Sequence, residues 1–354
     1  MKEVDELYMQ RCLQLARCGE GSTSPNPMVG AVIVCDGRII GEGYHIRAGE
    51  PHAEVNAVNS VSEEDRPLLA RSTMYVSLEP CSHFGKTPPC CDMIIARGIS
   101  RVVVGSTDPN TRVNGAGIER MRAAGIDVTV GVLEEECFRL NRAFFTSQLL
   151  SRPYVTLKWA QSSDGFIDLL RDSGSAVRIS TPVSQVAVHK LRAQNDAILV
   201  GRHTALLDDP SLDVRHWAGR APLRLVIDKN GTLPACLKIF NGVQPTVVYT
   251  AFEEDGKFGN NVEQVVLDFK EPLLPQILAH LHKIKVNSLL VEGGATVLQS
   301  FIDASLWDEV RVEVNNSLEL GCGVVAPSFP LASPCARENL AGNEILHFYR
   351  QKTP

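Results

Sequence analysis

The sequence lacks the apolar segments of a membrane or secreted protein. No apolar run among its 354 residues is long enough to cross a bilayer. The first residues, MKEVDELYMQRCLQLARCGEG, have the spacing of an amphipathic helix but not the apolar core of a secretion signal, so we expect a cytoplasmic protein. The expected apolar face of this helix carries Val4, Leu7, Tyr8, Leu15 and Ala16.

Basic runs, internal repeats and low-complexity segments are also absent. The net charge is −6, so the composition offers no general attraction for nucleic acid. With 44% hydrophobic and 21% charged residues, the chain has the composition of a globular protein with full cores. We therefore expect neither a nucleic-acid nor a membrane partner.

The pattern of strands and helices predicts two α/β domains. A chain of 354 residues exceeds the size at which a single core keeps growing. In the first part, strand-like runs alternate with helical stretches, which predicts a three-layer α/β/α domain with a mostly parallel sheet. The segment EEECFRLNRAFFTSQLLSRP predicts one terminal helix that ends before Pro153. We expect domains at 1–149 and 150–354, the second with a ligand site at its strand ends.

Ten cysteines are numerous for a protein without a secretion signal. Disulfides are not expected in a reducing compartment, so clustered cysteines indicate a metal site. Cys81, Cys90 and Cys91 form the one cluster in the sequence, and the other seven are expected to be small buried apolar residues.

His52, Cys81 and Cys90 have the chemistry of three zinc ligands. One imidazole and two thiolates leave the fourth tetrahedral position open, as in a catalytic site. His52 and Cys90 each follow a proline and begin a predicted helix, where the helix dipole favours anionic ligands. Glu54, close behind His52, would shuttle protons between a zinc-activated water and the substrate.

A closed structural zinc site is the alternative. It would need His83 or Cys91 as the fourth ligand, and it has no use for Glu54. Cys91 points about 100° around the helix from Cys90, so we expect it to pack in the core.

Four motifs resemble the deaminase half of the bifunctional riboflavin-biosynthesis family, in which a pyrimidine deaminase is fused to a uracil reductase: PNPMVGAVIV, GYHIRAGEPHAEVNAV, EPCSHFGKTPPC and STDPN. The long loop between Cys81 and Cys90 distinguishes this family from cytidine and tRNA-adenosine deaminases. The resemblance implies a cytidine-deaminase-like fold, zinc ligands at His52, Cys81 and Cys90, and a proton shuttle at Glu54. The implied substrate contacts are Asn26, His45, Lys86, Asp108 and Asn110.

These contacts have a chemical rationale, but some also have a simpler explanation. Lys86 would supply a cation for the substrate phosphate. Asn26 and Asn110 can present both a donor and an acceptor to a base or ribose. Turn chemistry alone would also explain Asn26, which lies between two prolines, and the Asp108-Pro109-Asn110 segment.

The second half carries a strand, then Gly293-Gly294, then a helix. This arrangement lets backbone N–H groups bind a phosphate at the helix N-terminus, although tight turn geometry alone would also explain the glycines. The polar loop VGRHTALLDDPSLDVR contributes Asp208 and Asp209, which could bind a metal or a ribose or could cap a helix.

Four further motifs, LKWAQSSDG, LRAQNDAILVG, TALLDDPSLDVR and LLVEGG, resemble the reductase half of the same family. The resemblance implies a dihydrofolate-reductase-like fold and NADPH as the cofactor. Lys158 is the candidate to polarise or protonate the opened sugar oxygen, and Arg192 and Arg215 would bind the substrate phosphate. The implied substrate contacts are Arg192, Leu212, Arg215 and Glu292, and the implied NADPH contacts are Thr204, Asp208, Gly293 and Gly294.

The sequence departs from this family at AVRIS, where Ala176 and Arg178 replace the usual serine and tryptophan. The change removes a substrate hydrogen bond and an apolar cofactor contact, although Arg178 could stack on a ring or bind a cofactor phosphate. The alternative is an active deaminase whose C-terminal domain binds a ligand or oligomerises without reducing anything. NADPH binding would distinguish the two.

Together the two halves predict a bifunctional enzyme of riboflavin biosynthesis. It would hydrolyse the 2-amino group from 2,5-diamino-6-ribosylamino-4(3H)-pyrimidinone 5′-phosphate and then reduce the ribosyl side chain to ribityl with NADPH. The long inter-cysteine loop, the acidic charge and the reductase-like half disfavour a tRNA-editing deaminase. A structural zinc protein explains neither Glu54 nor the second domain. A homo-oligomer is expected by analogy with the family.

Overall fold

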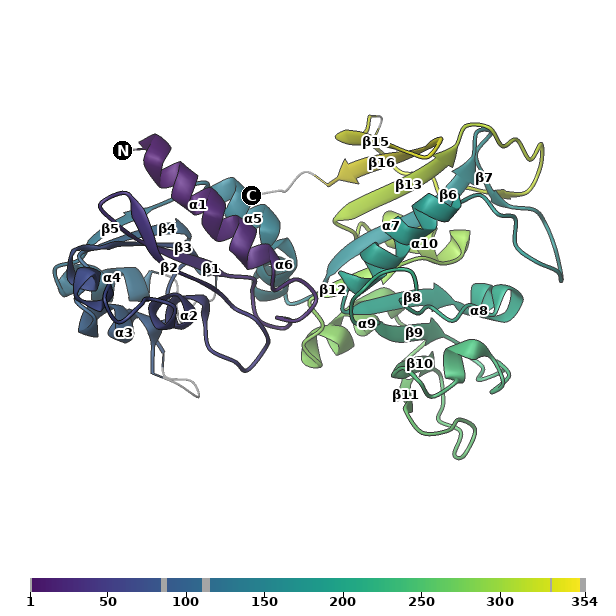
Figure 1. Cartoon of the computed structure of the whole chain (residues 1–354). Coiled ribbons are helices and arrows are strands. Elements are labelled where there is room, and N and C mark those ends of the chain that lie inside the picture. The colour runs from purple at the N-terminus through teal and green to yellow at the C-terminus, as the bar shows by residue number, and fades with distance from the viewer. Residues whose placement is uncertain (1, 84–87, 110–114, 332, 351–354) are drawn as a thin grey trace. The chain divides into compact units, whose positions relative to one another are not determined.

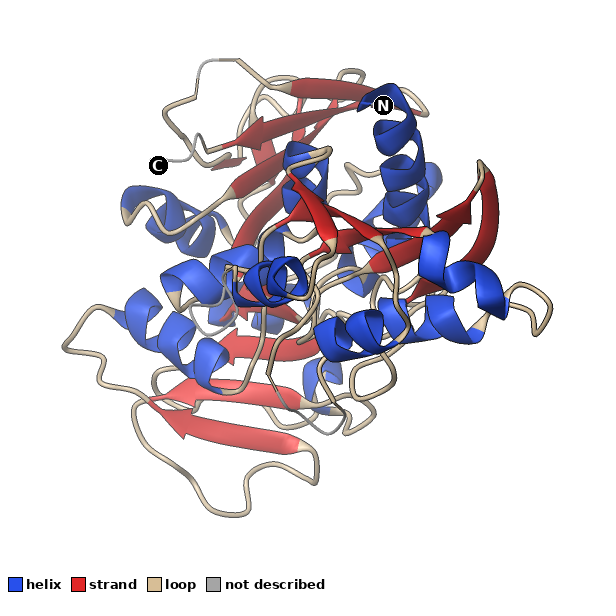
Figure 2. Cartoon of the chain, turned by 90° about the vertical axis from the view of Figure 1, so that its left-hand side faces the viewer, coloured by secondary structure: helices blue, strands red, loops and turns tan. Residues whose placement is uncertain are grey.

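The computed structural model describes residues 2–83, 88–109, 115–331 and 333–350. The chain divides into two compact units, Met1–Ser151 and Arg152–Pro354, each with its own sheet (Figure 1). Helices, strands and the loops that join them are distinguished in Figure 2. Within the described ranges, none of the helices is long and apolar enough to cross a membrane.

The first unit is built on a five-stranded sheet with the order β2-β1-β3-β4-β5. Its strands are β1 Gly30–Cys35, β2 Arg38–Tyr44, β3 Thr73–Leu78, β4 Arg101–Ser106 and β5 Asp127–Val130. Its helices are α1 Lys2–Arg17, α2 Ala53–Asn59, α3 Cys90–Ala96, α4 Ala116–Ala123, α5 Glu134–Leu140 and α6 Arg142–Leu150, with a 3₁₀ turn at Arg66–Arg71. β3, β4 and β5 are parallel, but β1 is antiparallel to both of its neighbours, so the expectation of a mostly parallel sheet is wrong. The tight hairpin at Asp36-Gly37 reverses the chain and makes the sheet mixed.

Successive side chains of β1 point to opposite faces of the sheet and contact different helices. Ala31 and Ile33 pack with α2, α3 and α4, whereas Val32 and Val34 pack with α1 and α5 (Figure 1). The unit therefore has the predicted three layers, with helices on both faces of one sheet.

The predicted face of the first helix is only partly buried: Ala16 is buried, and Tyr8 and Leu15 pack against the core. Val4 and Leu7 are 51% and 60% exposed. The buried residues are Asp5, Met9, Cys12, Leu13 and Ala16. The cause is Asp5, which accepts hydrogen bonds from both terminal nitrogens of Arg101 (2.8 Å each) and from the Tyr75 hydroxyl (2.9 Å). These bonds turn the acidic side of the helix towards the sheet.

The predicted terminal helix of this unit is broken in two at Asn141, between α5 and α6. Asn141 is 3% exposed and leaves helical geometry, with φ −104° and ψ 21°. Its side chain accepts a hydrogen bond from the Met28 N–H and donates one to the Met28 carbonyl, both 2.8 Å. The Asn141 side chain at this break therefore fixes the loop before β1, which carries Asn26.

The second unit is built on a nine-stranded sheet with the order β11-β10-β9-β8-β12-β6-β13-β16-β15. All neighbours from β11 to β13 are parallel, and β16 and β15 add antiparallel pairs at one edge. Its strands are β6 Tyr154–Ser162, β8 Ala197–Gly201, β9 Leu223–Ile227, β10 Thr246–Thr250, β11 Val262–Val266, β12 Ser288–Val291, β13 Glu309–Asn315, β15 Ala336–Leu340 and β16 Asn343–Tyr349. Its helices are α7 Pro182–Ala193, α8 Arg202–Asp208, α9 Leu273–Lys283 and α10 Ala295–Asp303, with a 3₁₀ turn at Lys238–Phe240. A separate two-stranded sheet pairs β7 Phe166–Asp168 with β14 Val324–Val325.

The central strands of this sheet are apolar because both faces are covered. β8 and β12 are buried along their whole length. Leu199 and Val291 pack with α9 and α10, whereas Ile198 and Val200 pack with α7 and α8 on the other face. Since parallel strands end at the same edge, the segments that follow β6, β8, β9 and β12 meet there.

The cysteines outside the cluster do not all lie in the cores. Cys12, Cys35 and Cys137 are buried as expected. The expectation is wrong for four others, which are exposed because they lie in turns and loops outside the packed elements: Cys18, Cys236, Cys322 and Cys335.

Candidate active sites

Three candidate metal ligands converge in the first unit. His52 directly precedes α2, Cys90 begins α3, and Cys81 follows β3. The His52 Nδ1 atom lies 3.4 Å from the Cys90 Sγ and 3.7 Å from the Cys81 Sγ. A tetrahedral zinc site with bonds of about 2.0–2.3 Å has ligand atoms about 3.5–3.8 Å apart, so this donor set fits zinc in size and in chemistry.

The fourth position of this set is open. Among the described residues, the group of converging ligands contains His52, Cys81 and Cys90 and neither His83 nor Cys91. Cys91 is buried in the core, as predicted, and His83 is exposed. This arrangement disfavours a closed structural site.

One thiolate is available to the metal near neutral pH. A hydrogen bond from the Cys90 thiol, followed by one from His52, lowers the pKa of Cys81 to about 4. The Cys90 backbone N–H also donates to the Cys81 Sγ at 3.3 Å. Because α3 begins at Cys90, its N-terminal N–H groups add to this stabilisation of negative charge.

Glu54 lies in the first turn of α2, beside the ligand set. It is 3% exposed. Burial raises its pKa, although the nearby His52 opposes the rise when it is charged, and the Cys90 thiol also interacts with this carboxyl. A carboxyl group whose pKa is raised towards the working pH is suited to accept and return a proton.

Asn26 and His45 form a pair next to the metal ligands. The His45 Nδ1 atom lies 3.1 Å from the Pro51 carbonyl, which can only accept, so we assign the proton to Nδ1. The His45 Nε2 atom then accepts from the Asn26 side-chain amide at 3.2 Å. Burial lowers the pKa of His45, which keeps the ring neutral in this role. The ring centroids of His45 and His52 are 5.6 Å apart.

Glu79 is a buried residue of this site that the sequence analysis missed. Its carboxylate accepts hydrogen bonds from the backbone N–H groups of Asp108 (3.2 Å), Gly115 (3.0 Å), Gly117 (3.0 Å) and Ile118 (3.4 Å). Glu79 therefore ties both ends of the loop that carries Asp108 to the end of β3. A charged residue directly after a buried strand was the available signal. Asn110 in this loop, and Lys86, lie outside the described residues.

We expect Cys81→Ser to lose both bound zinc and deamination, because a hydroxyl is a poor replacement for a thiolate ligand. Metal analysis of the purified protein together with ammonia release would measure both. Cys18→Ser is the matched control, since Cys18 is an exposed cysteine of the same unit. Stoichiometric zinc in C81S would contradict this ligand assignment.

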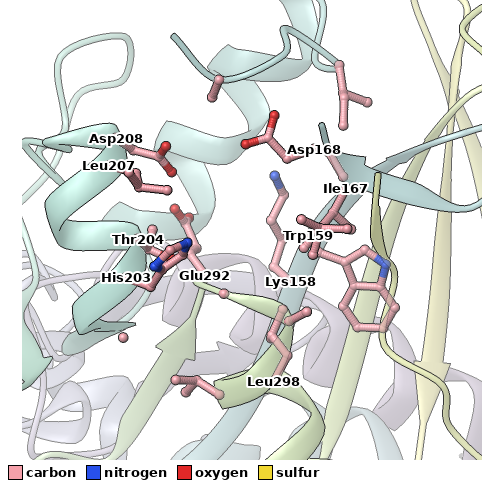
Figure 3. A pocket seen from close by; sticks show the side chains of 18 of the residues that line it. Lys158, Trp159, Ile167, Asp168, His203, Thr204, Leu207, Asp208, Glu292 and Leu298 are labelled. Carbon is pink, nitrogen blue, oxygen red and sulfur yellow. The ribbon is translucent and has the colours of Figure 1, made fainter. Parts of the chain in front are cut away.

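The second unit contains a cavity of about 910 Å³ at the edge where its parallel strands end. Most of the residues predicted for the reductase line it: Lys158, Ala176, Arg178, Arg192, Thr204, Asp208, Arg215, Glu292 and Gly294. Figure 3 shows the Lys158 side chain extended into this cavity with its amine end towards Asp168. Of the predicted residues that the structure describes, Leu212, Gly293 and Asp209 are not on the wall, and Asp209 instead binds the backbone and side chain of Lys238. Leu212 is 2% exposed and packs in the core.

Arg192 and Glu292 form a buried ion pair in the cavity wall, with Nη2 and Oε2 2.7 Å apart. Burial acts most strongly on Glu292 and would raise its pKa, but the charges of Arg192 and then Lys158 hold the pKa below its usual value. Arg192 also donates to the Asp213 carbonyl at 3.2 Å. The Arg192 charge is therefore already balanced by Glu292. A substrate phosphate that binds Arg192 would have to share the guanidinium with the Glu292 carboxylate.

The Gly293-Gly294 turn is required by geometry. A Cβ atom on Gly293 would lie 2.8 Å from the Val200 Cγ1 atom, and Gly294 has φ +66°. The turn leads directly into α10, whose first residues line the cavity. Tight geometry therefore explains the glycines, and the turn also places the N-terminus of α10 at the cavity, where phosphate binding stays a prediction.

Arg171, in the segment that follows β7, joins this segment to β7 and to the end of α8. Its Nε atom lies 2.7 Å from an Asp168 oxygen, its Nη1 donates to the Gly174 carbonyl at 2.7 Å, and its Nη2 donates to Asp208. Ala176 and Arg178 lie further along this segment, and both line the cavity. Asp208 is therefore already paired, and an NADPH contact would have to share it with Arg171.

We expect Arg171→Ala to raise the KM for NADPH about tenfold, equivalent to ~1.4 kcal/mol, with a smaller change in kcat. Without Arg171, the Asp168 and Asp208 carboxylates would face an anionic cofactor uncompensated. Steady-state NADPH oxidation at low and high salt would measure the effect. Arg337→Ala, which breaks an exposed pair with Glu344 in the same unit, is the control. An unchanged KM in R171A would contradict this role.

Comparisons with known proteins match both units. Residues 2–106 match the family model of the cytidine and deoxycytidylate deaminase zinc-binding region, and residues 153–321 match that of the RibD C-terminal domain. The riboflavin biosynthesis protein RibD of Aquifex aeolicus is 43% identical over 316 residues, 88% of this chain and 87% of that protein. Its namesake in Escherichia coli is 40% identical over 326 residues, with the same shares. A crystal structure of a diaminohydroxyphosphoribosylaminopyrimidine deaminase/5-amino-6-(5-phosphoribosylamino)uracil reductase from Thermotoga maritima has a TM-score of 0.89 and 36% identity, and the match covers 98% of this chain and 99% of that one.

The folds and the two sites define a bifunctional enzyme, a zinc-dependent deaminase unit followed by an NADPH-dependent reductase unit. With relatives of this identity along most of its length, the chain belongs to the RibD family of riboflavin biosynthesis.

Proposed function

We propose that the first unit hydrolyses the 2-amino group from 2,5-diamino-6-ribosylamino-4(3H)-pyrimidinone 5′-phosphate. His52, Cys81 and Cys90 would hold zinc, which when bound supplies a Lewis acid that makes water acidic near neutral pH. Glu54 takes a proton from the attacking water as the new C–O bond forms. It then returns the proton to the amino group, so that ammonia leaves as the C–N bond breaks.

Asn26 and His45 hold the pyrimidine at this site. One N–H of the Asn26 amide donates to His45, so its second N–H and its side-chain oxygen are the groups offered to the base or ribose. The remaining proposed contacts are Asp108, on the loop fixed by Glu79, together with Lys86 and Asn110.

The second unit reduces the ribosyl side chain of the deaminated product. NADPH, when bound, supplies the hydride that reaches C1′ of the sugar. Lys158 donates a proton to the sugar ring oxygen as its bond to C1′ breaks, so the substrate gains one hydride and one proton. Arg215 binds the 5′-phosphate. Arg192 and Glu292 contact the substrate from the cavity wall, and Leu212 stays a predicted contact that the cavity wall does not support.

The cofactor contacts are proposed along one side of the same cavity. Thr204 and Asp208 belong to α8, and Gly294 precedes α10. Gly293 shapes the turn, and Arg178 takes the place of the aromatic contact usual in the family.

The buried Glu54 carboxyl beside three converging zinc ligands carries the first half of this proposal. The test is to give the purified protein the diaminopyrimidine ribosyl phosphate, measure ammonia, then add NADPH and follow its oxidation. Ammonia followed by NADPH oxidation supports both assignments. Ammonia without NADPH oxidation would refute the proposed reductase reaction for this chain.

A further inference from the structure

Glu313 is a buried carboxylate directly behind the cavity wall of the reductase unit. It lies on β13, next to β6, and is 2% exposed. One of its oxygens lies 3.8 Å from the Lys158 Nζ atom. The residues that line the cavity include Lys158 and do not include Glu313, both of which the structure describes.

Two neutral donors fix the Glu313 carboxylate in place. The Ser180 hydroxyl donates to Oε2 at 2.6 Å, and the Asn343 side-chain amide donates to Oε1 at 2.7 Å. Asn343 also donates to the Ile179 carbonyl at 3.2 Å. Each oxygen thus has a donor from a different segment of the chain. The carboxylate cannot follow the lysine, so the flexible lysine must orient towards it.

Glu313 remains ionised in this environment. Burial is the strongest single influence and opposes ionisation, but the Lys158 charge and then the Ser180 hydroxyl hold the pKa of Glu313 below its usual value. A buried charge is retained at this cost only when it is paired and hydrogen-bonded, and both conditions are met.

Most of the other charged groups around Lys158 are already engaged elsewhere. Arg311, beside Lys158 in the strand register, donates to Glu309 at 2.5 Å. Of the titratable groups that line the cavity with Lys158, Glu292 pairs with Arg192 and Asp168 pairs with Arg171, and His189 lies on α7. In the described part of the chain, Glu313 is the carboxylate that forms an ion pair with Lys158 within 4.0 Å.

We propose that Glu313 is a positioning residue of the reductase, which holds the Lys158 amine at the cavity wall, where it can reach the sugar oxygen. The inference rests on the proposed role of Lys158. It also explains how the unusual AVRIS segment is held, since the Ser180 that ends this segment is bound to the same carboxylate.

The test is Glu313→Gln, assayed by NADPH oxidation over a range of concentrations of NADPH and of the deaminated substrate. We expect kcat to fall about 10- to 100-fold, within the range of proton-transfer effects. Both KM values should change little, because Glu313 is not among the residues that line the cavity. Glu313→Asp keeps the charge and is expected to retain most of the wild-type kcat.

Glu344→Gln is the matched control, because Glu344 lies on the adjacent strand β16 and pairs with the exposed Arg337. Ammonia release should be unchanged in all these variants. An unchanged kcat in E313Q overturns the proposal, and so does an equal fall of kcat in E313Q and E313D. Should E313Q fail to fold, Ser180→Ala removes one orienting donor and keeps the charge. A several-fold lower kcat in S180A supports the proposal, and an unchanged kcat overturns it.

The failure of this proposal can be separated from failure of the proposed reductase mechanism. An inactive Lys158→Met variant together with a normal E313Q variant refutes the role of Glu313 alone. An active K158M variant refutes the role of Lys158, and the inference with it.

Discussion

Glu54→Gln is expected to lower the rate of deamination by about 10²- to 10⁴-fold, the usual range for general acid–base catalysis. The amide keeps the size of the side chain but cannot take a proton from water. Zinc content should be unchanged, because the three converging ligands do not include Glu54. Ammonia release from the diaminopyrimidine substrate and metal analysis of the same preparation would measure both effects.

The control for this variant is Glu50→Gln, an exposed glutamate in the loop before α2. It should deaminate at the wild-type rate. In E54Q, NADPH oxidation should stay at the wild-type level when the already deaminated substrate is supplied, because Lys158 and its cavity belong to the second unit. Normal ammonia release by E54Q would show that the proton moves through another group.

Lys158→Met is expected to produce the opposite pattern, with reduction lowered by about 10²- to 10⁴-fold and deamination intact. Methionine is close to lysine in length but has no proton to give. The substitution also leaves the buried Glu313 carboxylate without its counter-charge, so we expect a lower melting temperature as well. NADPH oxidation, ammonia release and thermal unfolding would measure the three effects.

Lys190→Met is the control for K158M, because Lys190 is an exposed lysine on α7 that lies 5.0 Å from the Trp217 ring centroid. It should keep both activities. If K158M bound NADPH normally but did not oxidise it, the loss would lie in proton transfer and not in cofactor binding. Wild-type reduction by K158M would remove Lys158 from the mechanism.

The convergence of the three proposed zinc ligands could be predicted because each is a metal-binding residue type next to the end of a helix or strand. His52 and Cys90 stand at helix starts, and Cys81 stands just beyond a buried strand. Residue type and position next to a helix or strand end were sufficient there. Lys158 and Glu292 were expected from the resemblance to the reductase family, and both line the cavity, Lys158 from the middle of β6 and Glu292 directly after β12.

The supporting residues could not be predicted, because their roles consist of contacts between distant parts of the sequence. Glu79 and Gly117 are 38 residues apart, and Ser180 and Glu313 are 133 apart. In α1, periodicity alone predicted the burial of Ala16 correctly but that of Val4 and Leu7 wrongly, since it treats every acidic residue as exposed. Asp5 is buried because Arg101, 96 positions away, binds it with both terminal nitrogens.

The hydrogen bonds between Asn141 and Met28 bear on how the two activities could be separated by truncation. A fragment that stopped after β5 would contain every proposed zinc ligand and Glu54, yet it would lack the residue that fixes the loop of Asn26. We infer that such a fragment would still take up zinc but would bind its pyrimidine poorly. The shortest useful deaminase fragment therefore extends through α6, and a fusion or split-enzyme design should cut the chain only beyond that helix.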